Sequence, residues 1–281
     1  MTRQQTHRIA ITVMTIVSAI VVIPIIMVIG YVIWMGISAV NWEFLTQAPR
    51  NGMTEGGIMP AIVGTVILTL GTAIVSMPLS IATAIYLAEY AGDNRVTRWV
   101  RLAMVNLAGI PSIVYGLFGL GAFVLFAGFG TSIIAGSLTL GIMTMPVVIS
   151  TSEEAILAVP QQFRTVSLSL GASKWQTIWH QILPQALPGI LTGMILGLGR
   201  AAGETAPILF TVAAFYLPQL PQSIFDQTMA LPYHLYVIAT QVPGMPVSIQ
   251  YGTALVLLGF VLSLTLIASL VRTFMRRQRE W

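Results

Sequence analysis

Six long apolar runs constrain this chain more than any other feature of its sequence. They cover residues 9–40, 58–88, 102–129, 132–150, 187–217 and 251–274. About 20 helical residues cross the hydrocarbon core of a bilayer, where only helices or closed barrels satisfy every backbone hydrogen bond. Barrel strands would alternate apolar and polar residues over about 10 positions, and these runs are continuous instead. The runs therefore predict an all-α, polytopic membrane protein with six transmembrane helices.

The composition excludes the other classes of chain. Charged residues make up only 8% of the 281 residues, and hydrophobic residues make up 56%. A soluble domain carries about 25% charged residues. A soluble globule of this size could not bury so much apolar surface, and a disordered chain would need more charge. The first run is too long for the apolar core of a signal peptide and lacks a small-residue cleavage site, so we expect it to be retained.

The placement of Lys and Arg predicts the orientation of the chain. If the N-terminus is cytoplasmic, the outside segments hold Arg50 alone, and Arg200 lies within a span. The other basic residues then all lie inside: Arg3, Arg8, Arg95, Arg98, Arg101, Arg164, Lys174, Arg272, Arg276, Arg277 and Arg279. This bias follows the positive-inside rule. We expect both termini in the cytoplasm, in a plasma membrane or a Gram-negative inner membrane, with lipid as a partner and without nucleic-acid binding.

The connections between the runs predict the organisation of the chain. Residues 1–57 would form an N-terminal tip, a first span and an external loop, residues 58–275 a core of five spans, and residues 276–281 a basic tail. The external segment 218–250 is rich in proline, and its apolar piece 231–242 is too short to cross. We expect that piece to lie at the interface or to dip into the membrane.

No set of residues for catalysis stands out. The sequence has no GxxxxGK[ST], HExxH or GxSxG motif. Cysteine is absent and the three histidines lie in different segments, so we expect no metal site and no cofactor. Glu153 and Glu154 are adjacent and would point about 100° apart on a helix. We interpret them, with Ser152, as the capped and solvated start of a helix, and we do not expect an enzyme.

The cytoplasmic link 153–184 has the pattern of two short helices. Gly171 is placed to end the first in the left-handed conformation, Ser173 to cap the second, and Pro184 to stop it. Apolar residues of the second recur at helical spacing: Trp175, Ile178, Trp179, Ile182 and Leu183. The pattern fits either an amphipathic helix on the bilayer surface or a rigid aromatic docking element for a cytoplasmic partner.

A charged pair interrupts the fifth apolar run. Arg200 costs about 2.5–3.5 kcal/mol at the middle of a membrane, so it requires a partner or a polar path. Glu204 lies four residues later and would share its helix face. Two interpretations stay open, a neutralised structural pair and a face that lines a substrate path. The guanidinium suits carboxylate and phosphate oxyanions and so predicts an anionic cargo. Glycines spaced four apart would let neighbouring helices approach closely: Gly193, Gly197, Gly199 and Gly203.

The link 153–184 resembles the "EAA" loop of permease subunits in type I ABC importers. Gly171, Leu183 and Pro184 match that loop, whereas Thr165, Val166 and Ser167 replace its Glu-Ala-Ala and Gln181 replaces its Ile. In that family the loop is a coupling helix that sits in a groove of the ATPase subunit. The resemblance therefore implies ATPase coupling by a set of residues around the turn: Phe163, Arg164, Leu170, Gly171, Ala172, Lys174 and Trp175.

Two further stretches resemble the permeases of phosphate importers, those of the PstA type most closely. They are Gly-Arg-Ala-Ala-Gly-Glu-Thr-Ala-Pro at residues 199–207 and Gly-Ile-Pro-Ser-Ile-Val-Tyr-Gly-Leu-Phe-Gly at residues 109–119. The resemblance implies the type I importer permease fold, with Arg200, Glu204 and Thr205 on the substrate path. It also implies a homologous permease subunit (PstC-like), an ATPase dimer (PstB-like) that hydrolyses the ATP, and an external phosphate-binding protein (PstS-like).

Three alternatives to a phosphate permease stay open. The cargo could be another oxyanion. A secondary anion transporter would bury several ionisable residues and show internal repeats, whereas here one buried pair and no clear repeat are found. A membrane anchor or assembly factor would need neither Arg200 nor the protruding link.

Overall fold

The fold is built on long apolar helices. In this computed structural model, residues 3–92 and 94–277 are described. Within them, five helical segments are long and apolar enough to cross a membrane: Ile11–Gly36, Met59–Tyr90, Ile133–Leu157, Lys174–Gly203 and Val247–Met275. Their main helices are α1 (Arg3–Gly36), α3 (Met59–Ile85), α6 (Ile133–Leu157), α9 (Leu183–Gly203) and α12 (Val247–Arg277). The predicted all-α membrane class is therefore confirmed.

The sequence had suggested that the third apolar run is one straight span, but the structure shows it bent. It forms α4 (Arg95–Ala108), α5 (Ser112–Gly119) and η3 (Leu120–Phe126), with a bend of 103° between α4 and the α5–η3 segment. Pro111 explains the break, because proline lacks the N–H that a continuing helix needs and disfavours helical geometry in the residue before it. The structure thus has six spans only if this bent pair counts as one.

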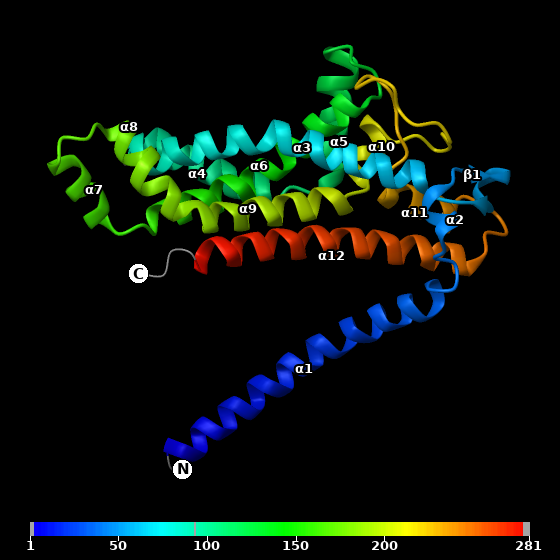
Figure 1. Ribbon diagram of the computed structural model, residues 1–281, viewed down its shortest axis with the longest axis horizontal. Helices are drawn as coiled ribbons and strands as arrows, with labels where there is room; N and C mark the ends of the chain where they lie inside the picture. The colour runs from blue at the N-terminus through cyan, green and yellow to red at the C-terminus, as the bar shows by residue number, and fades with distance from the viewer. Residues whose placement is uncertain (1–2, 93, 278–281) are drawn as a thin grey trace.

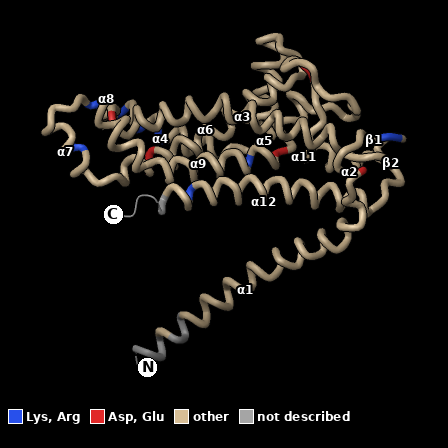
Figure 2. The backbone as a smooth tube through the Cα atoms, viewed as in Figure 1, with Lys and Arg blue, Asp and Glu red and all other residues tan. Residues whose placement is uncertain are grey.

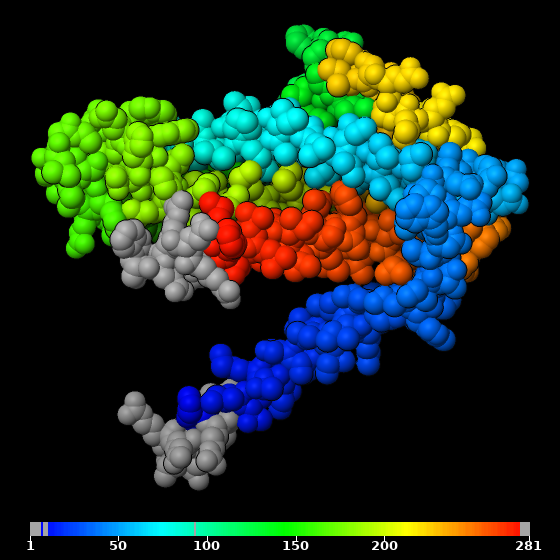
Figure 3. Space-filling view, in the orientation of Figure 1, coloured from blue at the N-terminus to red at the C-terminus, as the bar shows by residue number. Residues whose placement is uncertain are grey.

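Four of the long helices form a bundle, and α1 leaves it. Helices α3, α6, α9 and α12 run side by side, whereas α1 diverges from the end where it meets α12 (Figures 1 and 3). There Gly36 approaches the backbone of Tyr251 closely, and the rings of Tyr31 and Tyr251 lie 5.5 Å apart. Most apolar side chains of α1 are exposed in the isolated chain, as expected for a surface that faces lipid or another subunit.

Small residues let the bundle helices pack closely. A Cβ atom at Gly193 would collide with the side chain of Thr151, and one at Gly197 would lie 2.8 Å from Val148. The predicted close approach at these two glycines is therefore confirmed, and the partner is α6. Among the described residues, a Cβ at Gly203 would meet nothing within 4 Å, so the spacing of Gly199 and Gly203 serves no comparable contact there.

Short elements close the two ends of the bundle. At the end where α1 meets α12, the chain forms α2 (Trp42–Thr46), the antiparallel pair β1 (Pro49–Arg50) and β2 (Glu55–Gly56), and η1 (Asn51–Met53) between them. The same end holds α10 (Ala206–Thr211) and α11 (Leu231–Thr240). Helix α11 lies in the predicted short apolar piece, and its Leu231, Val237 and Ile238 are buried against the bundle.

The other end of the bundle carries the α7–α8 hairpin, defined here as residues 161–177. It consists of α7 (Gln161–Ser169) and α8 (Lys174–Thr177), followed by the π-helical turn η4 (Ile178–Ile182), and a second π-helical turn, η2 (Tyr86–Tyr90), ends α3 beside it. We call this the hairpin end. Figure 2 shows charged residues gathered there, around α4, α7 and α8. Of the predicted basic tail, residues 278–281, with Arg279, lie outside the described part of the chain.

The interpretation of Ser152 and Glu153 as a solvated helix start was wrong. Both lie near the end of α6, which continues to Leu157, and both are buried. The Glu153 carboxylate is paired with Arg101 of α4, with 2.7 Å between Nη2 and Oε1. The prediction failed because of a tertiary contact. Arg101, 52 positions earlier in the chain, compensates the charge of the Glu153 carboxylate, so this carboxylate need not face water.

Candidate functional site

The predicted Arg200–Glu204 pair forms at a break in a spanning helix. Arg200 lies in the last turn of α9, and its Nε is 3.1 Å from Oε1 of Glu204. The helix ends at Gly203, and Glu204 has extended backbone angles (φ −76°, ψ 133°). The spacing had suggested that the two residues share a helix face, and that prediction is wrong. The fifth apolar run is correspondingly two helices, α9 and α10, joined by Glu204 and Thr205.

Neither charge of this pair is sealed in the packed interior. The side chain of Arg200 is 36% exposed in the isolated chain and that of Glu204 is 17% exposed. Non-helical backbone at membrane depth is tolerated where it is buried in protein or lines a water-filled cavity. Arg200 also sits at the negative end of the α9 dipole, which favours a cation. The arrangement suits a guanidinium that is held in place and still reachable by water or an anion.

The two sequence stretches singled out above meet at this break. Helix α5 packs on α10 so closely that a Cβ at Gly116 would lie 2.9 Å from the carbonyl oxygen of Ala206 and 3.0 Å from Cα of Pro207. Tyr115, the neighbour of Gly116, is buried and donates a hydrogen bond to the Leu107 carbonyl at 2.8 Å. Residues 109–119 therefore support the backbone that follows Arg200.

Thr205 completes the break. It precedes α10, and its hydroxyl makes no capping hydrogen bond to that helix. Its carbonyl accepts a hydrogen bond from the Leu209 N–H at 3.1 Å. The side chain is partly exposed next to Glu204. The break thus brings a cation, a carboxylate and a hydroxyl into one short stretch of chain.

The turn of the α7–α8 hairpin has the geometry that its sequence predicts. Gly171 has φ +85°, which suits glycine because a side chain is strained there. Ser173 caps α8 in a capping box with Gln176.

The expected end of the second short helix at Pro184 is wrong, because the helical path from Lys174 runs on to Gly203. The π turn η4 ends directly before α9, and Pro184 is the second residue of α9, so the proline lies where the path changes from π-helical to α-helical.

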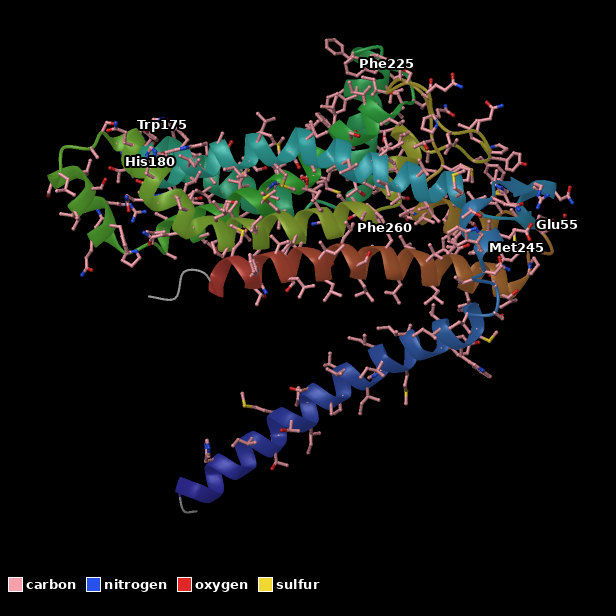
Figure 4. The ribbon with its side chains drawn as sticks, viewed as in Figure 1. Glu55, Trp175, His180, Phe225, Met245 and Phe260 are labelled. Atoms are coloured by element: carbon pink, nitrogen blue, oxygen red, sulfur yellow. The ribbon has the colours of Figure 1, made fainter. Side chains whose placement is uncertain are left out.

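One face of the hairpin presents apolar side chains to the surroundings. Leu170 is 83% exposed and Trp175 is 56% exposed, and the rings of Trp175 and Trp179 stack with 5.8 Å between centroids. Figure 4 places Trp175 near His180 at this end of the molecule. A groove of about 500 Å³ runs along the hairpin, and it is lined by Gln162, Phe163, Val166, Ser167, Leu170, Ala172 and Gln181.

The two basic residues of the hairpin contact the end of α3, Arg164 as an enclosed side chain and Lys174 as an exposed one. Arg164 forms an ion pair with Glu89 of η2, with 2.7 Å between Nη2 and Oε1. Lys174 donates a hydrogen bond to the Glu89 carbonyl and lies 4.7 Å from the ring centroid of Tyr90. Sequence reasoning missed Glu89, although an acid directly after the apolar run 58–88 was a signal that it needed a partner. No three metal-ligating side chains come together among the described residues.

Comparison with known protein families gives a match over most of the chain. Residues 76–280 match the family described as "Binding-protein-dependent transport system inner membrane component". The chain is 32% identical to the probable ABC transporter permease protein YqgI of Bacillus subtilis, with 86% of each chain covered. It is also 32% identical to the phosphate transport system permease protein PstA 1 of Mycobacterium tuberculosis, over 92% of this chain and 84% of the relative. The PstA protein of Xylella fastidiosa is 32% identical over 87% of this chain and 83% of its own.

Solved structures of ABC importers share the fold. A chain of a bacterial ABC transporter involved in the import of the acidic polysaccharide alginate superposes with a TM-score of 0.65 at 15% identity, covering 99% of this chain and 98% of its own. A chain of the inward-facing MetNI methionine ABC transporter gives 0.60 at 15% identity, covering 78% and 94%. This likeness concerns the fold alone. The family match and the relatives above 30% identity show that the chain belongs to the inner membrane components of binding-protein-dependent transport systems.

Proposed function

We propose that the chain is a permease subunit of an ATP-driven importer of inorganic phosphate and forms half of its translocation path. The observation that carries this proposal is Arg200, a partly exposed cation at the broken end of a spanning helix. An intramembrane ionisable residue marks a substrate path by default. The relatives named as phosphate transport permeases support phosphate as the cargo.

Arg200, Glu204 and Thr205 would act on the passing anion. The guanidinium of Arg200 offers planar, paired N–H donors to phosphate oxygens and offsets their charge. Glu204 holds that guanidinium at 3.1 Å and competes with the anion for it, so the site attracts phosphate without trapping it. The Thr205 hydroxyl can donate or accept a further hydrogen bond at the break.

The α7–α8 hairpin would couple this path to ATP hydrolysis. Its exposed apolar groove has Phe163, Leu170 and Ala172 in its lining, and this groove and the exposed Trp175 suit docking on the ATPase subunit. Gly171 fixes the angle between the two helices. The assembly would hold a PstC-like permease, two PstB-like ATPases and a PstS-like external binding protein. The hairpin end and both termini would then face the cytoplasm.

Phosphate uptake into vesicles tests the proposal. The complete importer is reconstituted with ATP inside and the loaded binding protein outside, and the uptake of radiolabelled phosphate is measured. Arg200→Gln should abolish uptake while the complex still assembles, because a neutral amide cannot offset the charge of the anion. Arg50→Gln is the matched control: Arg50 forms an exposed ion pair with Glu43 at 2.8 Å, and its loss should leave uptake unchanged.

Two results would contradict the proposal. Uptake that survives Arg200→Gln would remove this residue from the path. Uptake of radiolabelled sulfate in preference to phosphate, in the same vesicles, would replace the cargo with another oxyanion.

A further inference from the structure

The ion pair between Arg164 and Glu89 is the most enclosed of the described ion pairs. Their side chains are only 12% and 8% exposed. Arg164 donates to Oε1 of Glu89 from both Nε, at 3.0 Å, and Nη2, at 2.7 Å. The partners are 75 positions apart in the sequence, Arg164 on α7 and Glu89 at the end of α3. The pair therefore joins the hairpin directly to a spanning helix.

Arg164 also binds the end of a second spanning helix. Its Nη1 donates to the Val159 carbonyl at 2.7 Å, and its Nη2 donates to the Ile156 carbonyl at 2.9 Å. Ile156 lies in the last turn of α6, where carbonyls lack partners within the helix and carry the negative end of its dipole. One guanidinium thus holds α7, the end of α6 and the end of α3 together.

The surroundings of this junction restrict its movement. Lys174 of α8 binds the carbonyl of Glu89 itself, so both helices of the hairpin reach the same residue. Beneath the pair lies a separate apolar core that includes Ala84, Ile156, Ile178 and Ile182, and Phe163 packs against it. Two π turns, η2 and η4, border the junction, and such turns are frequent at functional sites.

We propose that Arg164 and Glu89 form a clamp that transmits movement of the α7–α8 hairpin to α3 and α6. This inference rests on the proposed coupling of the hairpin to an ATPase. A guanidinium that is turned inward cannot supply the docking contact itself, so Arg164 is a positioning residue. With the clamp closed, a push on the hairpin displaces the ends of two spanning helices. With the clamp open, the hairpin can follow the ATPase while the spans stay in place.

The absence of cysteine from the chain allows a selective test. The double variant Glu89→Cys, Arg164→Cys is prepared in the complete importer, with other reactive cysteines replaced. Uptake of phosphate and stimulation of ATP hydrolysis by the binding protein are measured before and after bridging the two thiols. One bridging reagent is short, about as long as the lost ion pair, and the other is several times longer.

We expect the unbridged variant to assemble and to hydrolyse ATP, while uptake per ATP falls about tenfold or more, because a buried pair has been lost. The short bridge should restore that ratio, and the long bridge should not. The matched control, Glu43→Cys with Arg50→Cys, breaks an exposed pair at the opposite end and should change nothing. Glu89→Gln, which keeps the size of the side chain, should give the same loss if the double variant fails to assemble.

Either of two outcomes would overturn the clamp. One is an unbridged or Glu89→Gln variant with an unchanged ratio of uptake to hydrolysis. The other is an assembled variant that neither bridge restores, which would make the pair a merely structural contact. If phosphate is the wrong cargo, vesicles with the wild-type importer take up no phosphate. A failed clamp instead leaves the ratio of uptake to hydrolysis in the variant equal to that of the wild type, so the two failures are distinguishable.

Discussion

The Nε atom of Arg200 lies 3.1 Å from Oε1 of Glu204, across the point where α9 ends. Because Glu204 has extended backbone, the helix that carries Arg200 does not fix the position of the carboxylate. The two charges can separate by a change at residues 204 and 205 without unwinding α9. In the proposed transport role, this freedom lets the guanidinium exchange its carboxylate partner for a passing anion.

Glu204→Gln should slow transport by strengthening the hold on phosphate. With the competing carboxylate removed, the guanidinium charge is no longer offset and the anion leaves more slowly. We expect uptake into vesicles to fall about tenfold, which corresponds to about 1.4 kcal/mol of tighter binding. Radiolabelled phosphate retained by the purified complex should rise. Glu43→Gln, an exposed acid at the same end of the molecule, should change neither quantity, and wild-type uptake by Glu204→Gln would contradict the release role.

Replacing Gly171 should uncouple ATP hydrolysis from transport. At φ +85° a β-branched residue costs on the order of 1–2 kcal/mol, so Gly171→Val should distort the hairpin turn. A Cβ there would meet no described residue within 4 Å, so the effect is confined to the backbone. Gly171→Asn is the control, because asparagine tolerates this conformation. The ratio of phosphate uptake to ATP hydrolysis should fall in Gly171→Val and stay at the wild-type value in Gly171→Asn. The same ratio in both variants would argue against the docking role.

Features set by neighbouring residues could be predicted from the sequence, and long-range pairings could not. Gly171 and Ser173 predict the hairpin turn, and the spacing of Arg200 and Glu204 predicts their ion pair but not the end of the helix between them, because each of these signals lies within a few positions. The bend at Pro111 was missed because the apolar run continues through it. The partners of Glu153 and Glu89 come from helices 52 and 75 positions away, and the residues around each glutamate do not predict which partner it has.

Stability should depend on pH through His234 of α11. Its side chain is only 2% exposed, and its Nδ1 has no hydrogen-bond partner among the described residues. Burial lowers its pKa from 6.5 to about 4. The folded state therefore binds fewer protons than the unfolded state between these values. The stability present above pH 6.5 is lost as the pH falls toward 4, by roughly 3 kcal/mol in all.

Melting temperatures of the purified protein at pH 7.5 and pH 5 measure this dependence. Wild-type protein should melt at a lower temperature at pH 5, and His234→Phe should reduce the difference between the two values. His180→Gln, which changes an exposed histidine at the hairpin end, should keep the wild-type difference. The same difference in wild type and His234→Phe would show that other groups cause the dependence.

Gly193→Ala should destabilise the packing of α9 on α6. The added Cβ would collide with the side chain of Thr151, and overpacking of this kind typically costs about 1–3 kcal/mol. The melting temperature should therefore fall, and Thr151→Ala in the same chain should recover part of the loss by removing the colliding hydroxyl. Gly203→Ala adds the same atom where no described residue lies within 4 Å, so it should not lower the melting temperature. An equal fall at both glycines would mean that contact with α6 does not decide the outcome.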